Sequence, residues 1–460
     1  MIWARAAGAR AIGPWLGWAV ACALLAGCPT DEPVVDVDPI VDPLSRPAEP
    51  TLSPSSFQPS DDCAACHPDH AAQWATSSHA YAMVDPVFRA LVELRRADFD
   101  GAQDSFCLQC HTAIGTRGGE IVPHFDWDAL SPVVQEGVTC EACHRVSALE
   151  RPWNSGHVIQ EGGPVRGGIA DPASSPAHEA SFSDLLTGAS FCGGCHDVIE
   201  LGGLQLERPY EEWTEGPAPE EGRPCQSCHM PTTTGPAAVG GPSDRSLHDH
   251  RFVGIDVPLS EGFTTAAEEE VLRTRIGALL DGAASLDLVA APFVPGEVVD
   301  VVATLHNHID GHNLPTGSTF LRQAWLELTA TDADGTVLYR TGDLDANGDL
   351  RDHWSSLDPY GDADLVSYSS RLTAADGRPE LFPWRANEHS SGSIPPRHAR
   401  TSTLFVPTSA DTPGPLQIQA RVRLRTHPPH LLRALGLEHL VDRVETWDLA
   451  TASLQVPRGP

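Results

Sequence analysis

The chain contains 460 residues, with 62 acidic and 30 basic side chains, and its formal net charge is −32. All the basic side chains are arginines, because the sequence has no lysine. So negative a surface disfavours nucleic acids and anionic membranes, and it attracts positively charged proteins over long distances. The hydrophobic fraction of 41% is ordinary for a soluble globular protein, and the length suggests two or three domains.

Residues 1–28 have the pattern of a lipoprotein signal peptide. Arg5 and Arg10 precede an uncharged apolar stretch at residues 11–27, which ends in Leu-Ala-Gly before Cys28. This ending resembles a bacterial lipobox, in which the cysteine thiol receives diacylglycerol. We therefore expect lipidation at Cys28 and a lipid-anchored protein of the bacterial cell envelope, facing the periplasm or the cell exterior. The alternatives are a plain signal peptide and an uncleaved anchor helix, although the apolar run is short for a membrane span.

Residues 29–60 are predicted to form a disordered tether. They hold eight prolines and six acidic residues and almost no aromatic side chain. Such a composition cannot bury a core, and a proline-rich chain is semi-extended.

Five Cys-x-x-Cys-His pentads follow the tether. Their cysteines are Cys63, Cys66, Cys107, Cys110, Cys140, Cys143, Cys192, Cys195, Cys225 and Cys228, and their histidines are His67, His111, His144, His196 and His229. Two thiols three positions apart can add to both vinyl groups of one porphyrin, and the adjacent histidine then becomes the proximal ligand of the iron. The pentads therefore predict five covalent haem c groups.

Zinc knuckles and redox-active Cys-x-x-Cys pairs are the alternative interpretations of the pentads. Zinc usually takes four ligands from two half-sites, and neither alternative explains a histidine at the same offset five times. Only Cys22 and Cys28 lie outside the pentads, so no ordinary disulfide framework can form. Haem is attached covalently outside the cytoplasm, so the export signal and the pentads support one another.

Residues 61–257 are predicted to form a mainly α, haem-packed domain with little regular structure. Short helical patterns and frequent Gly and Pro separate the pentads. The clearest helix is expected at residues 86–97, with Val87, Leu91 and Leu94 on one face.

The sixth iron ligands are expected to be histidines. Of 21 histidines, five belong to the pentads, which leaves sixteen. Only three methionines exist, and Met230 adjoins His229 and cannot reach the opposite face of the same haem. Bis-histidine ligation gives low-spin iron, which exchanges electrons and does not readily bind a substrate.

Residues 61–257 resemble multihaem c-type cytochromes, in particular the haem domain of the tetrahaem cytochrome that works with hydroxylamine oxidoreductase. The matching stretches are the first pentad with Trp74 and residues 78–80, the block 137–144, the run 178–196, residues 210–213, and residues 225–231 before His250. The resemblance implies a haem-packed domain that transfers electrons. The fifth pentad departs from the tetrahaem pattern.

The same resemblance implies four distal haem ligands. They are His79, His157, His178 and His250. His248 competes with His250, being two residues away, and His70 and His124 are reserves. His70 stands close to its own pentad.

A helical linker is expected at residues 258–285, followed by an all-β sandwich domain at residues 286–460. Thr265 and Glu268 form a capping-box pattern at the start of a helix over residues 264–281. Strand patterns follow at residues 298–305, 324–331, 336–340, 401–407, 416–426 and 447–456, with a hairpin turn at residues 332–335. Six short strands with turn signals indicate an antiparallel β-sandwich.

The loop at residues 311–317 resembles one that recurs in the C-terminal domains of multihaem lipoproteins. Its Gly and Pro residues favour a tight loop that presents His312 outward. His312 is therefore a candidate fifth distal haem ligand that reaches across the domain interface. The alternatives are a small metal site with His306 and His308, and a structural turn.

Residues 343–349 match the front half of a calcium-binding loop, with Asp343, Asp345 and Asn347 at alternating positions and a glycine at the bend. The closing glutamate is absent, because Trp354 stands in its place. An ordinary acidic turn is therefore favoured over calcium.

These features predict an electron-transfer multihaem cytochrome c that relays electrons at the cell envelope. Its expected partners are another cytochrome or a membrane electron-transfer complex, and its lipid anchor would hold it at the membrane. The first alternative is a multihaem oxidoreductase that acts on a small nitrogen or sulfur compound at one five-coordinate haem. The second is a structural docking lipoprotein of an outer-membrane electron conduit.

Overall fold

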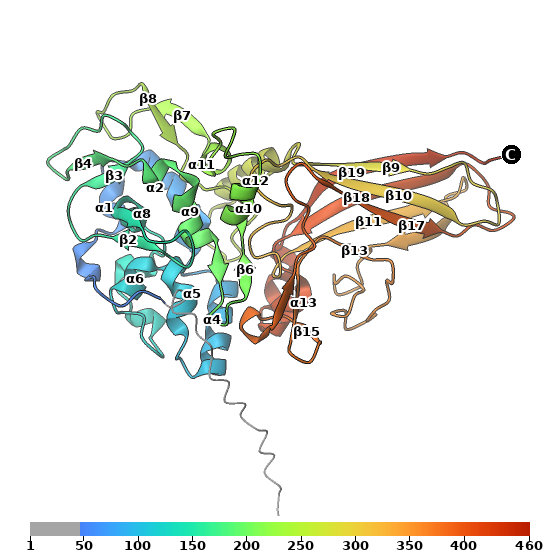
Figure 1. Ribbon diagram of the computed structural model, residues 1–460, viewed down its shortest axis with the longest axis horizontal. Coiled ribbons are helices and arrows are strands. Elements are labelled where there is room, and N and C mark those ends of the chain that lie inside the picture. The colour runs from blue at the N-terminus through green and yellow to red at the C-terminus, as the bar shows by residue number, and fades with distance from the viewer. Residues whose placement is uncertain (1–46) are drawn as a thin grey trace, which may run out of the picture. The chain divides into compact units, whose positions relative to one another are not determined.

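The computed structural model describes residues 47–460. The predicted signal peptide, the predicted lipidation site Cys28 and the first part of the predicted tether lie outside these residues. Figure 1 shows helices and short strands in the N-terminal part of the described chain and long strands in the C-terminal part. No helix within residues 47–460 is both long and apolar enough to cross a lipid bilayer.

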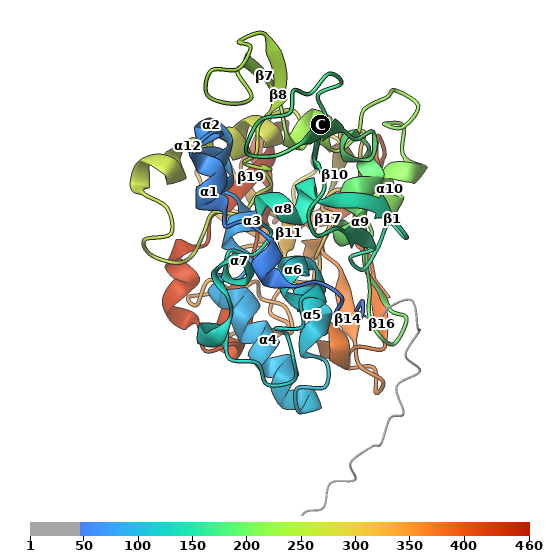
Figure 2. The ribbon, with the colours of Figure 1, turned by 90° about the vertical axis from the view of Figure 1, so that its left-hand side faces the viewer.

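The N-terminal region is built from short helices and short strand pairs joined by loops (Figure 2). The helices are η2 (Pro54–Ser56), α1 (Ser60–Ala64), α2 (Pro68–Trp74), α3 (Ser78–Tyr81), α4 (Pro86–Phe99), α5 (Asp104–His111), α6 (Ala113–Arg117), η3 (Trp127–Ala129), α7 (Pro132–Gln135), α8 (Cys140–His144), η4 (Leu185–Thr187), α9 (Ala189–His196), α10 (Pro209–Glu215) and α11 (Gln226–His229). The strand pairs are β1 (Val146–Leu149) with β2 (His157–Ile159), β3 (Val165–Gly167) with β4 (Ala180–Phe182), β5 (Val198–Ile199) with β6 (Gln205–Glu207), and β7 (Thr232–Gly235) with β8 (Arg245–His248). The predicted mainly helical region with little regular structure is thus confirmed.

Side-chain caps fix where several of these helices begin. Asp85 Oδ1 accepts a hydrogen bond from the Val87 N–H at 2.9 Å before α4. Thr139 Oγ1 accepts one from the Ala142 N–H before α8, which carries the third pentad. Because the first N–H groups of a helix lack backbone partners, such caps stabilise these short helices.

Helix α4 covers the predicted span and continues two residues further, but its buried face differs from the expected one. Leu91 and Leu94 are only half-buried, whereas Val92 and Arg95 are buried. Arg95 is tolerated inside because its guanidinium forms a buried ion pair with Glu200. A periodicity count cannot anticipate this, because it treats an arginine as a surface residue.

The last part of the predicted tether is packed against the helical region, which corrects the expectation of disorder there. Residues 54–56 form η2, and the Phe57 side chain is buried. The backbone N–H groups of Thr51 and Leu52 donate to the Arg117 carbonyl oxygen at 2.8 and 2.9 Å. Phe57 supplies the apolar surface that the rest of the proline-rich segment lacks.

The predicted linker helix is confirmed as α12 (Ala266–Leu280). Thr265 Oγ1 accepts from the Glu268 N–H, and the Glu268 carboxylate accepts from the Thr265 N–H at 2.8 Å, so the capping box is complete. Leu272 and Ile276 form the buried face of this helix.

The C-terminal region contains two antiparallel sheets and a small third one. The first sheet has the order β17 (Ala399–Val406), β10 (Val299–Asn307), β9 (Ala284–Val289). The second has the order β12 (Val337–Thr341), β11 (Gln323–Thr331), β18 (Leu416–Arg425), β19 (Thr446–Val456), and β13 (Val366–Ser367) also pairs with β11. The third has the order β15 (Pro379–Glu380), β14 (Arg371–Thr373), β16 (Glu388–Ser390), and the helices are η5 (Pro383–Arg385), α13 (Pro429–Ala434) and η6 (Glu438–Arg443). All six predicted strands are present.

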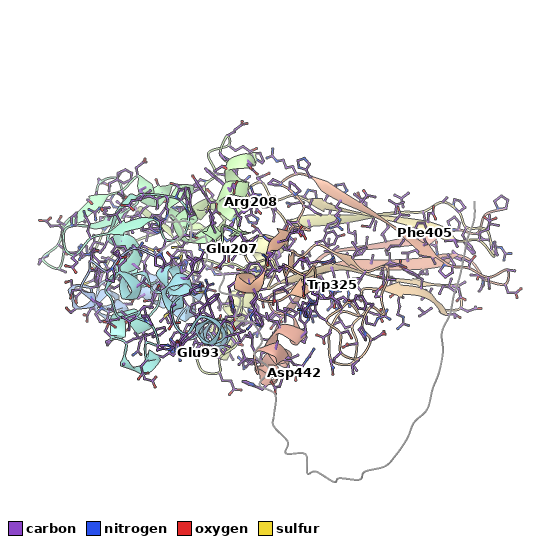
Figure 3. The ribbon with its side chains drawn as sticks, turned by 60° about the horizontal axis from the view of Figure 1, so that its bottom comes forward. Glu93, Glu207, Arg208, Trp325, Phe405 and Asp442 are labelled. Carbon is purple, nitrogen blue, oxygen red and sulfur yellow. The ribbon has the colours of Figure 1, made fainter. Side chains whose placement is uncertain are left out.

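The two larger sheets share one hydrophobic core. Along β10, side chains at alternating positions from Val299 to Leu305 are buried, and they pack with buried residues of β11 and β18. Along β17, Leu404 and Val406 are buried, whereas Phe405 between them is 56% exposed (Figure 3). Such alternation between a buried and a solvent face is typical of a sandwich.

The turn predicted at residues 332–335 closes the hairpin between β11 and β12. Asp332 Oδ1 accepts from the N–H groups of Asp334 and Thr336 at 2.9 and 2.8 Å. Gly335 has φ +83°, a conformation that glycine adopts without steric cost.

Candidate metal centres

Each pentad forms a helical turn. The His67 N–H donates to the Cys63 carbonyl oxygen at 2.9 Å, and the His229 N–H donates to the Cys225 carbonyl oxygen at 3.1 Å. A turn places residues i, i+3 and i+4 on one side, so both thiols and the imidazole face the same space. All ten pentad cysteines are free thiols. Two thiols and an imidazole on one side of a helical turn are the arrangement that attachment of one porphyrin through two thioethers requires.

Four of the five pentad histidines face a second imidazole. The pairs are His67 with His178, His196 with His79, His144 with His250 and His229 with His312, and the ring centres in every pair lie 6.2 Å apart. Three pairs are nearly parallel, with interplanar angles of 27°, 16° and 29°, while the His79–His196 pair is tilted by 58°.

This spacing fits a metal ion shared by two imidazoles. Nitrogen ligands lie about 2 Å from such an ion, so two rings on opposite sides of it have their centres roughly 6 Å apart. Each of the four pairs contains a pentad histidine, whose two neighbouring thiols could hold a porphyrin at the same place. The residues present therefore fit a haem iron between the rings of each pair.

In six of these eight imidazoles, Nδ1 contacts a backbone carbonyl group. The contacts from Nδ1 to a carbonyl oxygen are His67 to Ala237 (2.6 Å), His229 to Val253 (2.7 Å), His250 to His248 (2.8 Å), His312 to Asn313 (2.8 Å), His178 to Glu179 (3.0 Å) and His144 to Arg166. A proton on Nδ1 leaves Nε2 with a free electron pair, which is the form that binds a metal.

Burial keeps three of the imidazoles that face pentad histidines neutral. Desolvation lowers the pKa of His79 to about 4, of His250 to about 3 and of His312 to about 4. The nearby pentad imidazole lowers each pKa further, because two positive rings would repel each other. A metal-ligating histidine must be deprotonated at one nitrogen, so these rings need no proton release at neutral pH.

The remaining pentad histidine, His111 of the second pentad, has different surroundings. Its ring stacks on the Phe88 ring of α4, with centres 3.7 Å apart and planes 4° from parallel. Within residues 47–460, no second imidazole stands at the 6.2 Å spacing from His111. Burial lowers the pKa of His111 to about 4. The second pentad is thus the one for which the described chain offers no histidine pair.

The structure does not bring His157, predicted as a distal ligand, opposite a pentad histidine. Its Nε2 lies 2.7 Å from the Phe191 carbonyl oxygen, and its Nδ1 lies 3.8 Å from Cys195 Sγ. A Cβ atom at Gly194 would come within 2.2 Å of the His157 ring, so the ring lies directly on the backbone of α9. His79 takes the place opposite His196.

Of the competing and reserve histidines, His70 has its ring centre 6.3 Å from that of His67, but the two rings meet edge-on at 76°. His248 Nδ1 contacts the Met230 carbonyl oxygen at 2.8 Å. The His70 ring meets the His250 ring edge-on, with centres 4.8 Å apart. His124 Nε2 lies 3.1 Å from an Asp100 carboxylate oxygen.

His306 and His308 share a strand face as expected, with parallel rings 6.2 Å apart. Their Nε2 atoms contact Asp287 at 3.0 Å and Ser285 at 2.7 Å. His312 is directed to His229 instead. In the part of the chain that the structure describes, no group of three or more His, Cys, Asp or Glu side chains is arranged to hold a metal ion by themselves.

The acidic turn at residues 343–349 uses its carboxylates within the protein. Asp343 binds Arg351 at 2.6 Å, and Asp349 binds Arg433. Asp345 accepts from Ser355 Oγ at 2.6 Å. Arginines and a hydroxyl group thus occupy oxygens that a calcium ion would need, as the missing closing glutamate suggested.

Contacts between thiols connect the pentads. Cys63 lies against Cys140, Cys110 against Cys195, and Cys192 against Cys225, and in each pair the contact raises the pKa of the first thiol. Cys143 interacts electrostatically with Cys195. The first pentad therefore adjoins the third, the third adjoins the fourth, and the fourth adjoins the second and the fifth.

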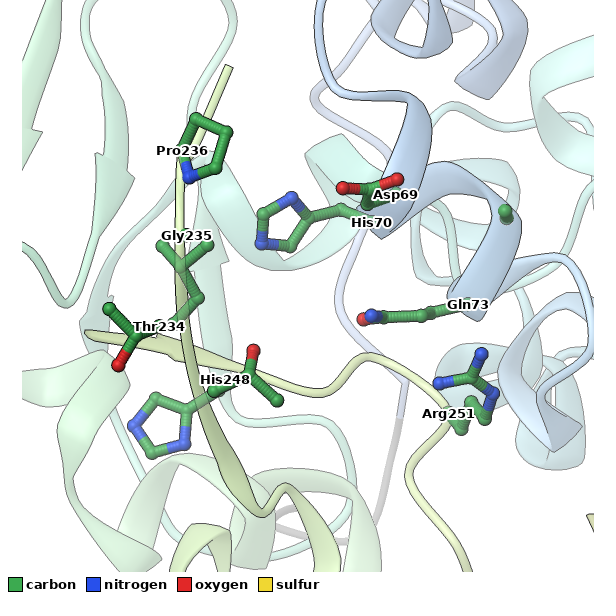
Figure 4. Close-up of a pocket in the computed structure, with 11 residues that line it drawn as sticks. Asp69, His70, Gln73, Thr234, Gly235, Pro236, His248 and Arg251 are labelled. Atoms are coloured by element: carbon green, nitrogen blue, oxygen red, sulfur yellow. The ribbon is translucent and has the colours of Figure 1, made fainter. Parts of the chain in front are cut away.

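A polar cavity of about 290 Å³ has His70 and His248 in its wall (Figure 4). It lies between α2 and the β7–β8 hairpin and is lined by Asp69, His70, Ala72, Gln73, Thr233, Thr234, Gly235, Pro236, Leu247, His248 and Arg251. Gln73 Oε1 accepts from the His250 N–H at 2.9 Å, which ties the wall of the cavity to the distal ligand.

Residues 62–145 match the family model described as cytochrome c554 and c-prime. The chain also has the fold of a penta-heme cytochrome c552 from Thermochromatium tepidum, with a TM-score of 0.61, 20% identity, and coverage of 87% of this chain and 99% of that one. The sporulation control protein Spo0M from Bacillus subtilis matches 39% of this chain and 50% of its own length, at 12% identity and a TM-score of 0.14. No curated protein is significantly similar to the sequence. The first two matches support the multihaem c-type cytochrome family, as the resemblance predicted.

Sequence reasoning identified all ten thiols, the eight paired imidazoles and His111 as candidates, but not their pairing. The stacking of Phe88 on His111 was missed, and no sequence signal marks it. His79 was predicted as a distal ligand, and the fold places it opposite His196 of the fourth pentad, more than a hundred residues later.

Proposed function

We propose that this protein is an electron-transfer multihaem cytochrome c that carries five covalent haems and relays electrons at the bacterial cell envelope. The observation that carries the proposal is the set of four imidazole pairs with ring centres 6.2 Å apart. An iron with imidazoles on both sides has no open position for a substrate, which favours electron transfer over catalysis.

The roles of the residues follow from their positions. The ten pentad cysteines would hold the porphyrins, and the five pentad histidines would be proximal ligands. His79, His178, His250 and His312 would be the distal ligands. A haem iron, when bound, supplies one-electron chemistry between its ferric and ferrous states. Burial lowers the pKa of His79, His250 and His312 and keeps these rings neutral, and Nδ1 hydrogen bonds hold the rings of His250 and His312 in register.

The contacts between pentads support a relay. Cys110–Cys195 and Cys192–Cys225 connect the second, fourth and fifth attachment sites, and Cys63–Cys140 connects the first and third. The interaction of Cys143 with Cys195 joins these two groups. A penta-heme fold relative that spans 87% of this chain supports the number five. No attachment site would then be isolated from the others.

The surroundings of His111 favour a second candidate function, an oxidoreductase that acts on a small nitrogen or sulfur compound. Phe88 stacks on this histidine, and residues 47–460 offer no partner imidazole for it. An iron at the second pentad would then have an open sixth position, which catalysis requires. The strongly acidic composition weighs against anionic substrates such as nitrite.

The proposed location rests on the sequence. The lipobox ending at Cys28 supports a lipid anchor, and covalent haem attachment supports export. The net charge of −32 supports a positively charged redox partner, such as another cytochrome or an exposed face of a membrane electron-transfer complex.

Two measurements test the main proposal. Mass spectrometry of the mature protein should show five haem additions and a diacylglycerol on Cys28, and fewer haems would mean that one pentad has another task. Low-temperature electron paramagnetic resonance of the oxidised protein should show four low-spin haems and one high-spin haem. Turnover of nitrite or hydroxylamine at tens per second would instead favour the oxidoreductase.

A further inference from the structure

Glu212 of α10 connects the helical region to the loop that carries His312. Its carboxylate accepts hydrogen bonds from the Asn313 N–H at 3.2 Å, from Asn313 Nδ2 at 3.0 Å and from Thr316 Oγ1 at 2.5 Å. All three donors belong to the loop at residues 311–317 and follow His312 in the chain. They lie about a hundred positions after Glu212 in the sequence.

Asn313 in turn orients the His312 ring. His312 Nδ1 lies 2.8 Å from the Asn313 carbonyl oxygen, so this carbonyl accepts the Nδ1 proton and leaves Nε2 free to face His229. On the other side, Asn307 Nδ2 donates to the His312 carbonyl oxygen at 3.3 Å. The peptide that holds the ring is thus fixed to Glu212 through both the backbone and the side chain of Asn313.

The neighbouring residues reinforce the same junction. Asp310, two residues before His312, binds Arg397 at 2.6 Å and also binds Arg223, which precedes the fifth pentad. Ser318 Oγ donates to Glu207 at the end of β6. The His312 loop is therefore attached to the helical region at both ends, and Glu212 is the attachment nearest to the ligand itself.

Glu212 is costly to place where it lies. Burial raises its pKa, and the hydrogen bonds from Thr316 and Asn313 act against that effect. A carboxylate that is partly removed from water needs donors for its oxygens, and here the donors come from the His312 loop. A fully exposed acidic residue would serve solubility equally well, so these three part-buried hydrogen bonds indicate a positioning role.

We propose that Glu212 is the positioning residue that holds His312 as the axial ligand of the haem on Cys225, Cys228 and His229. This inference rests on the proposed function, since it presupposes a haem at that pentad. The C-terminal region then acts as a ligand-donating module, and Glu212 fixes the module on its target. Removing a residue that orients a metal ligand typically lowers the affinity for the metal about 10- to 100-fold.

The test compares spin states in the full-length, haem-loaded protein. His312→Gly supplies the reference, in which one low-spin haem becomes high-spin. Glu212→Ala should give the same conversion at the same haem, with the haem count unchanged, and adding imidazole should restore the low-spin signal. In the variant that combines His312→Gly with Glu212→Ala, only one haem should change from low-spin to high-spin, because both changes act on one iron.

Glu215→Ala on the same helix is the matched control, because Glu215 is exposed and makes only a long contact with Arg208. It should leave every haem as in the unaltered protein. Glu212→Gln keeps the side-chain size but places an N–H group against the Asn313 donors, so it should convert the same haem in part. If Glu212→Ala does not fold, Glu212→Gln alone decides.

The possible results separate this inference from the proposed function. An unaltered protein without a haem on Cys225 and Cys228 would contradict the proposed function itself. Four low-spin haems in the unaltered protein, together with an unchanged spectrum in both Glu212 variants, would overturn only the role of Glu212. Loss of a haem in Glu212→Ala, with no high-spin signal, would also overturn it, because Glu212 would then act on attachment and not on the axial ligand.

Discussion

The imidazole rings of His229 and His312 lie 6.2 Å apart and 29° from parallel, although His229 ends a pentad helix and His312 lies in a loop of the β-rich region. The other three pairs join two residues of the helical region. Only at this pair would a metal ion be bound by both regions. The described residues 47–460 accordingly belong to one compact unit and not to two separate ones.

Replacing His312 should affect one haem, and replacing His157 should affect none. His312→Gly removes the ring that faces His229, so one low-spin haem should become high-spin. His157→Gln is the matched comparison, because both His157 nitrogens contact α9 and not a pentad histidine. Electron paramagnetic resonance of the oxidised variants distinguishes the two. A new high-spin signal in His157→Gln would mean that His157 is a ligand after all.

Carbon monoxide should bind to the reduced protein at one haem, the one on the second pentad. His111 stacks on Phe88 and has no imidazole partner among residues 47–460, so that iron would keep an open position. Replacing Cys107 and Cys110 by Ser should remove one haem together with the carbon monoxide difference spectrum.

The control for this experiment is the same change at Cys63 and Cys66. Their pentad has the His67–His178 pair, so the variant should lose one haem and still bind carbon monoxide. Carbon monoxide binding that survives the Cys107 and Cys110 replacement would place the open position at another pentad.

The sequence predicted local features well and long-range pairing poorly. The pentads and the capping box of Thr265 and Glu268 depend on residues within one turn, so spacing alone reveals them. The pairing of His178 with His67 depends on how the intervening loops fold, which no periodicity encodes. Phe57 was overlooked because eight prolines dominated the composition around it.

The acidic N-cap of α4 should make stability depend on pH. Burial raises the pKa of Asp85 to about 6 in the folded protein, from an ordinary value of 3.8. The folded state therefore binds this proton more tightly than the unfolded state. The contribution of the protonated Asp85 carboxyl group to the free energy of unfolding is fully present below pH about 4. It is lost as the pH rises to about 6 and stays lost above that, a difference of about 3 kcal/mol.

Asp85→Asn tests this effect, because asparagine keeps an oxygen that can accept from the Val87 N–H but carries no charge. Urea unfolding from pH 4 to 8 should show a smaller loss of stability in the variant than in the unaltered protein. The variant should be the more stable of the two at pH 8. Identical slopes in the two proteins would mean that Asp85 is ionised throughout this range.

The β-rich region should fold without haem, but only when the segment before its first strand is included. Val253, Ile255 and Ile276 lie before β9 and are buried in the core of the two sheets. Burial of each such side chain contributes about 1.5 to 3 kcal/mol. A single domain has a total stability of about 5 to 15 kcal/mol, so losing all three is a large fraction of it.

A fragment of residues 251–460 should therefore be colourless, show β-type circular dichroism and unfold cooperatively in urea. A fragment of residues 286–460 should unfold at a markedly lower urea concentration or be unfolded from the start. The matched variant Ile276→Ala in the longer fragment should lie between the two, because it removes one of the three side chains and leaves α12 in place. Equal stability of both fragments would show that the sheets need none of these residues, and an unfolded longer fragment would show that the β-rich region depends on the haem region for its structure.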